Sequence, residues 1–341
     1  MALGTTIPPP NIRTIPQVGR SWIYLSRFAP DMTDEDVRTL VTTQVVRKCD
    51  CATFQQNFRI SKDIFMDIVS LIGPHIAART DYGLTEEQKL AACLRYFGEG
   101  RYQHGTGKDF HVAMAQSTFS KVLRDVLPPM QSLLGDWIKL IMTEEERIEA
   151  KEYFFQKSGL PDVVMCVDGT HIKIKKPKLR PLQYMNRKKF YSINAMIVCD
   201  HKNRIRAIDA RFAGSHHDAH IWRVSPISKH FMDRHRNGFN DKLLGTFITR
   251  KPYRDPDSGS PESEFNRKHS SGRMIVERTI GLLKSRFRCL LGVDGILNYE
   301  PQKCAQIINV CCALHNICVE NNIEWNLHFQ SLLEDVGNDS D

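Results

Sequence analysis

The sequence lacks several features that would place it in a membrane or outside the cell. None of its apolar runs is long enough to span a bilayer, and its first residues, MALGTTIPPPNIRTIPQ, contain no apolar core of a signal peptide. It has ten cysteines but no C-x-x-C pair, and most of the cysteines lie in apolar segments. These absences predict an intracellular protein with reduced, buried thiols rather than a disulfide framework.

Charge is present but unevenly distributed. The chain has 341 residues and a net charge of +8, with residues 1–150 at −1, residues 151–330 at +13 and the last eleven at −4. A basic segment favours a polyanionic partner, most often nucleic acid. The alternative is a basic surface that only aids solubility.

The chain divides into four segments. Residues 1–20 are rich in Pro and Thr and are predicted to be a disordered lead-in. Residues 21–150 have helical periodicity, residues 151–325 mix strands and helices, and residues 326–341 form an acidic tail. A helix over residues 138–155, with an acidic run in its middle, is expected to link the two folded domains.

Residues 84–126 have the order of elements found in a helix-turn-helix unit. Thr85 and Gln88 form a possible capping box, a Gly-rich loop spans residues 98–107, a short helix is expected at residues 110–114, and a last helix begins at Ser117. On this interpretation five residues would face DNA: Ser117, Thr118, Ser120, Lys121 and Arg124. An ordinary helical bundle is an equally good interpretation.

The stretch VVMCVDGTHIKIKK, residues 163–176, is predicted to form two short strands around a turn at Gly169, with Asp168 where the first strand ends. Strands over residues 192–200 and 204–212 would complete an antiparallel meander of about four strands, followed by a helix over residues 219–231. A carboxylate at the end of a central strand is a common way to hold a catalytic metal.

A helix predicted over residues 273–290 carries two side-by-side stripes. The apolar stripe predicts a buried face and consists of Val276, Ile280, Leu283 and Phe287. The neighbouring stripe places one acid among three bases and consists of Arg273, Glu277, Gly281, Lys284 and Arg288. Glu277 could be a metal ligand among phosphate clamps, or one member of a surface ion-pair array.

Basic residues with interleaved aromatics follow the Asp168 stretch. Phosphates and bases suit such a surface, and the run could also act as a nuclear-import signal. A solvated strand edge protected by lysines is the alternative. The cations predicted to contact nucleic acid are Lys173, Lys175, Arg187, Lys188, Lys284 and Arg288.

Two other groups resemble metal-ligand sets. His216, His217 and His220 could ligate zinc, but flanking the Asp218 site or capping a helix is favoured, with Asp218 itself as an alternative N-cap. The face of the last helix that carries Cys304, Cys311, His315 and Cys318 is predicted to be core, because a straight helix cannot wrap four ligands around one ion.

The C-terminal half resembles the Harbinger transposase-derived nucleases, a family related to the PIF/Harbinger transposases. The matching stretches occur in the family's order over residues 155–320 and are VDGTHIKIKKP, YMNRKKFYSIN, GSHHDAHIW, EFNRKHSSGRMIVERTIGLLKSRFRCL and CCALHNI. The helical part at residues 54–126 resembles the family's N-terminal region more weakly.

The resemblance implies a ribonuclease-H-like mixed sheet flanked by helices, in a DDE-type nuclease domain over residues 151–325. It implies divalent-metal nuclease chemistry on DNA in the nucleus, with the cytoplasm as a second location, and a separate DNA-binding partner protein. The family's metal positions correspond to Asp168, Asp218 and Glu277, which would hold Mg²⁺ or Mn²⁺.

The sequence departs from the family pattern in one place. The family has a further acid in a motif like L-L-G-D-S-G-Y, whereas Gly245 here is followed directly by Thr246. Asp241 lies before the corresponding strand and Asp255 lies in a loop, so neither replaces that acid. The alternative function is therefore a catalytically decayed DNA-binding or adaptor protein, and sequencing the transcript across this junction would show whether the deletion is an error in the gene model.

Overall fold

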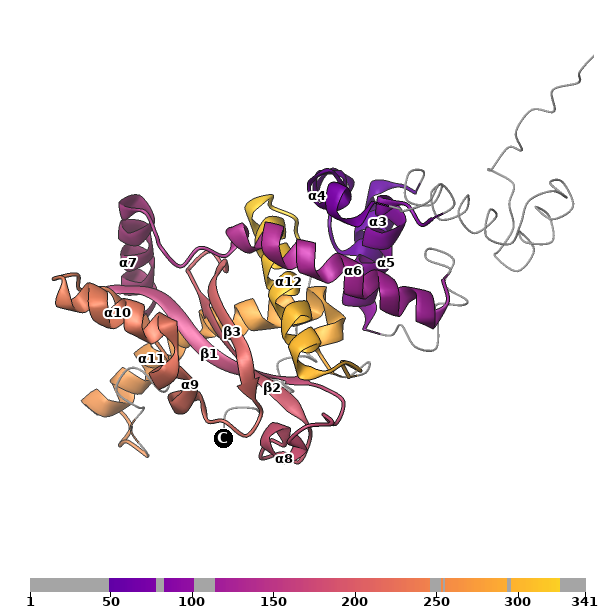
Figure 1. The fold of residues 1–341 in the computed structure, drawn as a ribbon. Helices are drawn as coiled ribbons and strands as arrows, with labels where there is room; N and C mark the ends of the chain where they lie inside the picture. The colour runs from indigo at the N-terminus through magenta and orange to yellow at the C-terminus, as the bar shows by residue number, and fades with distance from the viewer. Residues whose placement is uncertain are drawn as a thin grey trace, which may run out of the picture.

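A mixed β-sheet organises the part of the chain that the structure describes. The computed structural model describes residues 49–77, 83–100, 114–245, 253, 255–292 and 296–325. The antiparallel strands are β1 (Val163–Lys173), β2 (Ser192–Cys199) and β3 (Ile205–Ala213) (Figure 1). The short β4 (Lys242–Leu244) pairs parallel to β1, which gives the order β3-β2-β1-β4. The predicted α/β class, a mixed sheet flanked by helices, is confirmed.

Strand β1 is continuous, so the predicted turn at Gly169 is wrong. β1 pairs with β2 without interruption from Cys166 to Lys173. Glycine serves a different purpose here, because a Cβ on Gly169 would lie 2.4 Å from Oδ1 of Asp218. Asp168 therefore lies inside a strand rather than at its end. The meander has three strands, since the first two predicted strands are one.

The two faces of β1 carry different helices. Cys166 donates a hydrogen bond from Sγ to the Gly272 carbonyl of α11 (Pro261–Arg286), at 3.3 Å. Side chains alternate along a strand, so Asp168 shares that face. Gly169 points to the opposite face, where it meets the start of α9 (Asp218–Val224), which is followed by α10 (Pro226–Arg236).

The N-terminal helices pack against the α/β part and share one continuous hydrophobic core with it. They are α3 (Cys51–Phe58), α4 (Lys62–Ile76), α5 (Glu86–Glu99) and α6 (Gln116–Leu134), followed by the 3-10 turn η2 (Gly135–Trp137). The capping box between Thr85 and Gln88 is confirmed, with each side chain bonded to the other's backbone N–H. α6 contacts α12 (Pro301–Glu320), and α5 contacts η3 (Arg288–Leu290).

The helix-turn-helix interpretation stays a prediction. Residues 101–113, which hold most of the expected loop and short helix, lie outside the described residues. α6 begins at Gln116, close to the expected start at Ser117. Ser117, Ser120, Lys121 and Arg124 are exposed along it and Thr118 is half-buried, so the predicted DNA-facing residues are mostly accessible.

Three helix boundaries differ from the sequence prediction. α7 (Glu144–Ser158) begins six residues after the expected start, because Thr143 caps it in a capping box with Glu146. The acidic run is thus its first turn, where the helix dipole favours it. The helix expected over residues 219–231 is broken at Ser225, before Pro226. α11 begins at Pro261, twelve residues early, because Ser260 caps it within a stretch whose polar composition indicated a loop.

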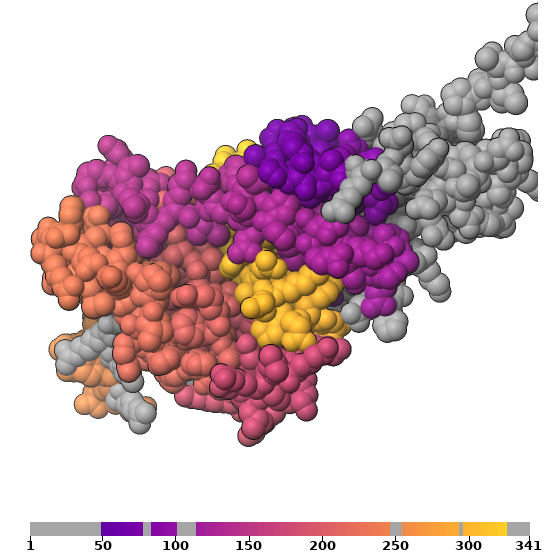
Figure 2. Space-filling view, in the orientation of Figure 1, coloured from indigo at the N-terminus to yellow at the C-terminus, as the bar shows by residue number. Residues whose placement is uncertain are grey.

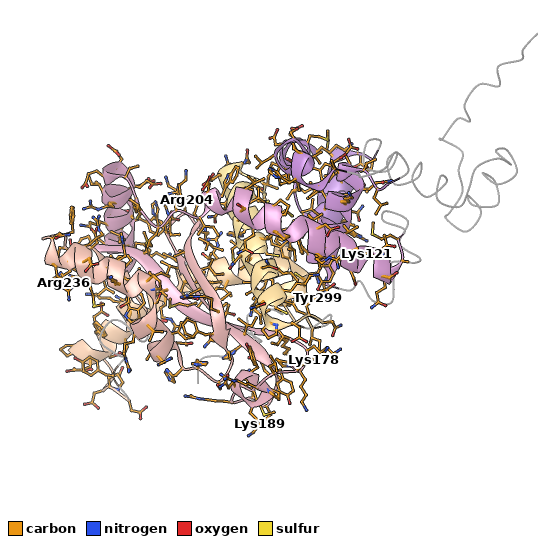
Figure 3. All side chains as sticks on the ribbon, in the orientation of Figure 1. Lys121, Lys178, Lys189, Arg204, Arg236 and Tyr299 are labelled. Atoms are coloured by element: carbon orange, nitrogen blue, oxygen red, sulfur yellow. The ribbon has the colours of Figure 1, made fainter. Side chains whose placement is uncertain are left out.

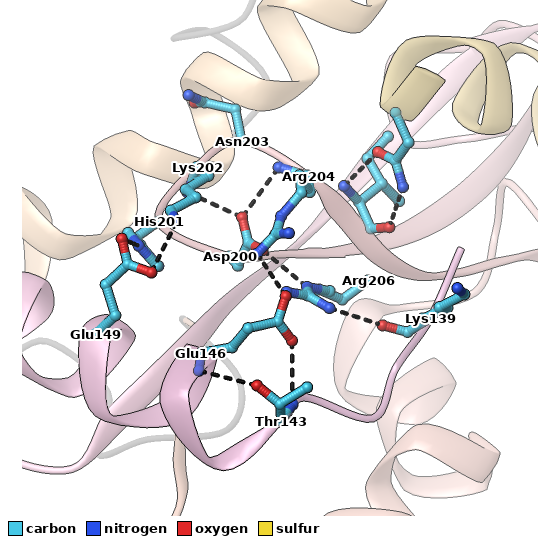
Figure 4. Close-up of polar contacts among 12 residues, drawn as sticks. Lys139, Thr143, Glu146, Glu149, Asp200, His201, Lys202, Asn203, Arg204 and Arg206 are labelled. Atoms are coloured by element: carbon cyan, nitrogen blue, oxygen red, sulfur yellow. Dashed lines mark hydrogen bonds and ion pairs between the residues drawn. The ribbon is translucent and has the colours of Figure 1, made fainter. Parts of the chain in front are cut away.

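Helix α7 is docked on the β2–β3 turn by charge (Figure 4). The fully buried carboxylate of Asp200 accepts from Nε of Arg204 at 2.8 Å and from Nε of Arg206 at 2.7 Å. Arg206 also donates to Glu146 at 2.6 Å. The acidic start of α7 therefore holds the edge of the sheet rather than acting as a free linker.

Helix α12 supplies much of the core between the two parts, and Figure 2 shows its outer face between the helical segment and the sheet segment. Cys304, Cys311, His315 and Cys318 are all 0% exposed, so the predicted core role is confirmed. Asn316 accepts from the Ile205 N–H and donates to the carbonyls of Ile205 and Trp137, each at 2.7 Å.

In the described ranges, no helix is both long and apolar enough for a membrane crossing.

Candidate active site

Arg273 connects two of the three predicted carboxylates. Its Nη2 lies 2.9 Å from Oδ2 of Asp168 and 3.0 Å from Oε1 of Glu277. Asp168 comes from β1, whereas Arg273 and Glu277 lie one turn apart on α11. The side chains of Arg273 and Asp168 are only 14% and 16% exposed. The two acids thus share one cation in a poorly solvated position.

Helix α11 presents these groups because its apolar stripe faces the core. The predicted stripe is confirmed by burial, with exposed fractions of 0–2% for Val276, Ile280, Leu283 and Phe287. Residues four apart lie on one helix face, so burying this stripe turns Arg273 and Glu277 toward Asp168 on β1.

The surroundings of Asp168 disfavour the charged form of its carboxyl group. Burial raises its pKa above the usual range, the guanidinium of Arg273 lowers it, and the charges of Asp218 and Glu277 raise it again. The net pKa shift is upward, so burial and neighbouring negative charge outweigh the single cation. An additional cation would be electrostatically favourable beside this carboxyl.

Asp218 approaches from the other face of β1. Its Oδ1 accepts a 2.7 Å hydrogen bond from Nδ2 of Asn194 on β2, and the same amide donates to the His216 carbonyl at 3.0 Å. The absent Cβ of Gly169 leaves room for this carboxylate. The sequence analysis did not single out Asn194 and gave Gly169 a different role. The one polar amide within the apolar strand β2 was a signal that could have identified Asn194.

The ligand chemistry of Asp168 and Glu277 fits a divalent cation. Mg²⁺ and Mn²⁺ prefer carboxylate oxygens, and these two acids already surround one positive group. Arg273 is bonded to the oxygens that an ion would use. Across the described ranges, no three His, Cys, Asp or Glu side chains form a group suited to an ion. Asp168, Asp218 and Glu277 as a metal-binding set stay a prediction.

Strand β4 ends beside this site. Leu244 pairs with Cys166, and a Cβ on Gly245 would lie 2.7 Å from Cγ1 of Val167, the residue before Asp168. The family acid would directly follow Gly245, and the residue that follows here, Thr246, lies outside the described residues. The described part of β4 thus ends level with Val167, one residue before Asp168.

Asp241 does not reach the site. It lies at the opposite end of β4, is 2% exposed, and is held by Arg234 at 2.7 Å, Lys151 at 3.1 Å and Arg147 at 3.2 Å. Asp255 is exposed in the loop before α11. The expectation that Asp241 is no replacement for the family acid agrees with these contacts.

Most of the predicted nucleic-acid contacts lie on an exposed surface at one end of the sheet. Lys175, Arg187 and Lys188 are exposed around α8 (Pro181–Tyr184), the region where Figure 3 labels Lys178 and Lys189. Lys173 is half-buried, with its ammonium 5.0 Å from the centre of the Phe190 ring. This basic surface combines cations with an aromatic ring, as phosphate and base contacts require.

The two cations from the C-terminal helix region differ from each other. Arg288 is exposed in η3. Lys284 is only 5% exposed and donates to the His171 carbonyl at 3.4 Å. Lys284 is therefore placed to position β1, and its predicted contact with DNA would require the amine to leave that carbonyl.

The histidines beside Asp218 flank it and cap its helix. His217 is the N-cap of α9 and accepts from the Ala219 N–H at 3.2 Å. The alternative that Asp218 is the N-cap is wrong, since Asp218 is the first helical residue. The rings of His216 and His220 stack on each other with 5.4 Å between their centroids.

Replacing Asp168 with Asn is expected to raise thermal stability at pH 7. A carboxyl whose pKa is raised in the folded state loses stability as pH rises through that pKa. The neutral amide avoids this loss, so the gain should shrink as pH falls toward 4. Differential scanning calorimetry of both proteins between pH 4 and 8 measures it, and a lower midpoint for Asp168→Asn at every pH would contradict this electrostatic account.

Comparisons with known proteins agree on the class. Residues 167–316 match the family described as DDE superfamily endonuclease. The human protein named "Putative nuclease HARBI1" is 29% identical over 266 residues, covering 75% of this chain and 74% of that protein. "Protein ALP1-like" of Arabidopsis thaliana is 27% identical over 301 residues, covering 80% and 71%. No solved structure matches.

The sheet, the paired carboxylates and the family match define an α/β domain of the DDE endonuclease class at residues 167–316. The chain is similar to the Harbinger transposase-derived nucleases, as its motifs indicated.

Proposed function

We propose that this protein is a divalent-metal-dependent DNA endonuclease with a ribonuclease-H-like catalytic fold. The observation that carries the proposal is the meeting of Asp168 from β1 and Glu277 from α11 around one cation, inside a DDE superfamily endonuclease domain. The strand order β3-β2-β1-β4, with only β4 parallel to β1, agrees with that fold.

Asp168 and Glu277 would hold Mg²⁺ or Mn²⁺, with Asp218 approaching β1 from the opposite face. When bound, the ion would activate water and stabilise the leaving oxygen of a phosphodiester. Asn194 orients Asp218 by donating a hydrogen bond to Oδ1. Because Gly169 has no Cβ, the Asp218 carboxylate can approach β1 at this position.

The basic surface around α8 would hold the DNA backbone. Lysine and arginine bind phosphate with an affinity that falls steeply as salt rises, because binding releases counterions. Exposed residues such as Lys175, Arg187 and Lys188 suit this role. The same basic run would direct the protein to the nucleus, and a separate DNA-binding protein would supply the target sequence.

A nicking assay on supercoiled plasmid tests the proposal. The purified protein is expected to nick DNA with Mg²⁺ or Mn²⁺ and to be inactive in chelator, and Asp168→Asn should lower the rate by at least 100-fold because a charged ligand is lost. The matched control is Asp233→Asn, an exposed acid on α10 paired with Arg236, which should retain the wild-type rate. Equal rates for Asp168→Asn and Asp233→Asn would assign the nicking to a contaminant.

Two observations favour a second candidate, a DNA-binding or adaptor protein that no longer cuts. Arg273 is bonded to both site carboxylates, and the family acid after Gly245 is missing. This candidate predicts salt-sensitive DNA binding that Asp168→Asn leaves unchanged, without metal-dependent nicking. Fluorescence anisotropy with labelled duplex at several salt concentrations, run beside the plasmid assay, separates the two candidates.

A further inference from the structure

We propose that Arg273 is the resident cation of the Asp168–Glu277 pair and competes directly with a divalent metal for it. The inference rests on the proposed function for the identity of the metal site. It adds that metal binds weakly while Arg273 is in place, and that this one side chain sets the metal affinity.

The contacts make the competition direct. One atom, Nη2 of Arg273, lies within 3.0 Å of both Asp168 Oδ2 and Glu277 Oε1. An ion bound by the same two oxygens would need that space, since carboxylate–Mg²⁺ distances are about 2.1 Å. Arg273 and a metal ion therefore cannot use the pair at the same time.

Arg273 is held at this place by charge. Its Nε is buried and has no hydrogen-bond partner among the described residues, so the contacts of Nη2 with the two carboxylates account for its position. The guanidinium of an arginine stays protonated over the whole physiological pH range, so this cation is permanent.

The missing acid favours Arg273 over a divalent ion at the Asp168–Glu277 pair. With a third carboxylate after Gly245, the pocket would hold three negative charges, and a divalent ion would be favoured over a single positive charge. With two, a guanidinium tethered to α11 neutralises half of the charge without giving up the hydration shell that a divalent ion must lose. Arg273 therefore weakens metal binding more beside two carboxylates than it would beside three.

Mn²⁺ binding in the absence of DNA tests this inference. Electron paramagnetic resonance and calorimetric titration with MnCl₂ are applied to the wild type, Arg273→Gln and Arg273→Lys. Arg273→Gln is expected to bind one Mn²⁺ at least tenfold more tightly than the wild type, and Arg273→Lys to stay near the wild type because it retains a positive charge. The matched control is Arg278→Gln, an exposed position on the same helix, which should leave the affinity unchanged.

The double variant Asp168→Asn with Arg273→Gln tests whether Asp168 is a ligand of the bound Mn²⁺. It is expected to lose the tighter Mn²⁺ binding of Arg273→Gln. A thermal midpoint that Mn²⁺ raises for Arg273→Gln more than for the wild type would confirm that the single variant is folded and binds through its native state. Equal Mn²⁺ affinity in the wild type and Arg273→Gln, or tight binding that persists without Asp168, would overturn the inference. Failure of the proposed function is a separate outcome, since it appears as absent nicking whatever the Mn²⁺ affinities are.

Discussion

An insertion of Asp-Ser-Gly-Tyr between Gly245 and Thr246 is expected to increase metal-dependent nicking by about 100-fold, the size typical of restoring one charged group to a catalytic site. Gly245 lies against Val167, and β4 runs parallel to β1. The next residue of a lengthened β4 would therefore come level with Asp168. The added carboxylate would give a divalent ion a third ligand and favour it over Arg273. Initial rates of plasmid nicking across a MnCl₂ titration measure the effect.

The matched control for that insertion is Asn-Ser-Gly-Tyr, which has the same length and nearly the same shape but no negative charge. If both insertions raise the rate equally, the benefit comes from the longer strand rather than from the carboxylate. If neither raises the rate, the deleted acid does not explain any deficit in activity, and the DNA-binding candidate gains support.

Asp241→Asn is expected to lower the free energy of unfolding by about 3 kcal/mol. When it is added to the Arg273→Gln variant, it is expected to leave the Mn²⁺ affinity of that variant unchanged. The carboxylate is 2% exposed and neutralises Arg147, Lys151 and Arg234. Removing one partner of a buried ion pair leaves uncompensated charge at a cost of about 3–5 kcal/mol. Urea denaturation measures the stability change.

The pH dependence of this loss has a defined sign. The pKa of Asp241 is lowered, since its hydrogen bonds from Lys151 and Arg234 outweigh its burial. Its stabilising contribution is present above its unfolded pKa and lost as pH falls through the folded value. The difference between Asp241→Asn and the wild type should therefore shrink below about pH 4, the unfolded value. Asp233→Asn serves as the exposed control, and an Mn²⁺ affinity that falls with Asp241→Asn would show that Asp241 does support the site.

Strong local signals predicted most of the secondary structure. The strands β2 and β3 and the buried stripe of α11 were predicted correctly, because each depends on residues close in sequence. Boundaries failed where a cap outweighed composition, as at Thr143 and Ser260. Gly169 was misinterpreted because its small size serves a carboxylate 49 positions away.

The site was predictable only as a set of residue types. The motif resemblance indicated Asp168, Asp218 and Glu277, and the stripe analysis placed Arg273 beside Glu277 on one helix face. Neither could show that Arg273 reaches Asp168 on β1, or that Asp218 meets β1 at the face opposite to Asp168.

The order of residues and their local periodicity were enough to indicate the resemblance to the Harbinger-type nucleases, the α/β class, the basic character of residues 151–330 and the missing acid after Gly245. Three-dimensional packing was needed to show which cation the two carboxylates hold and which acids lie apart from them. Such contacts join β1, β4, α7, α9 and α11 across long sequence separations, and only the packing of helices on the sheet fixes which charges meet.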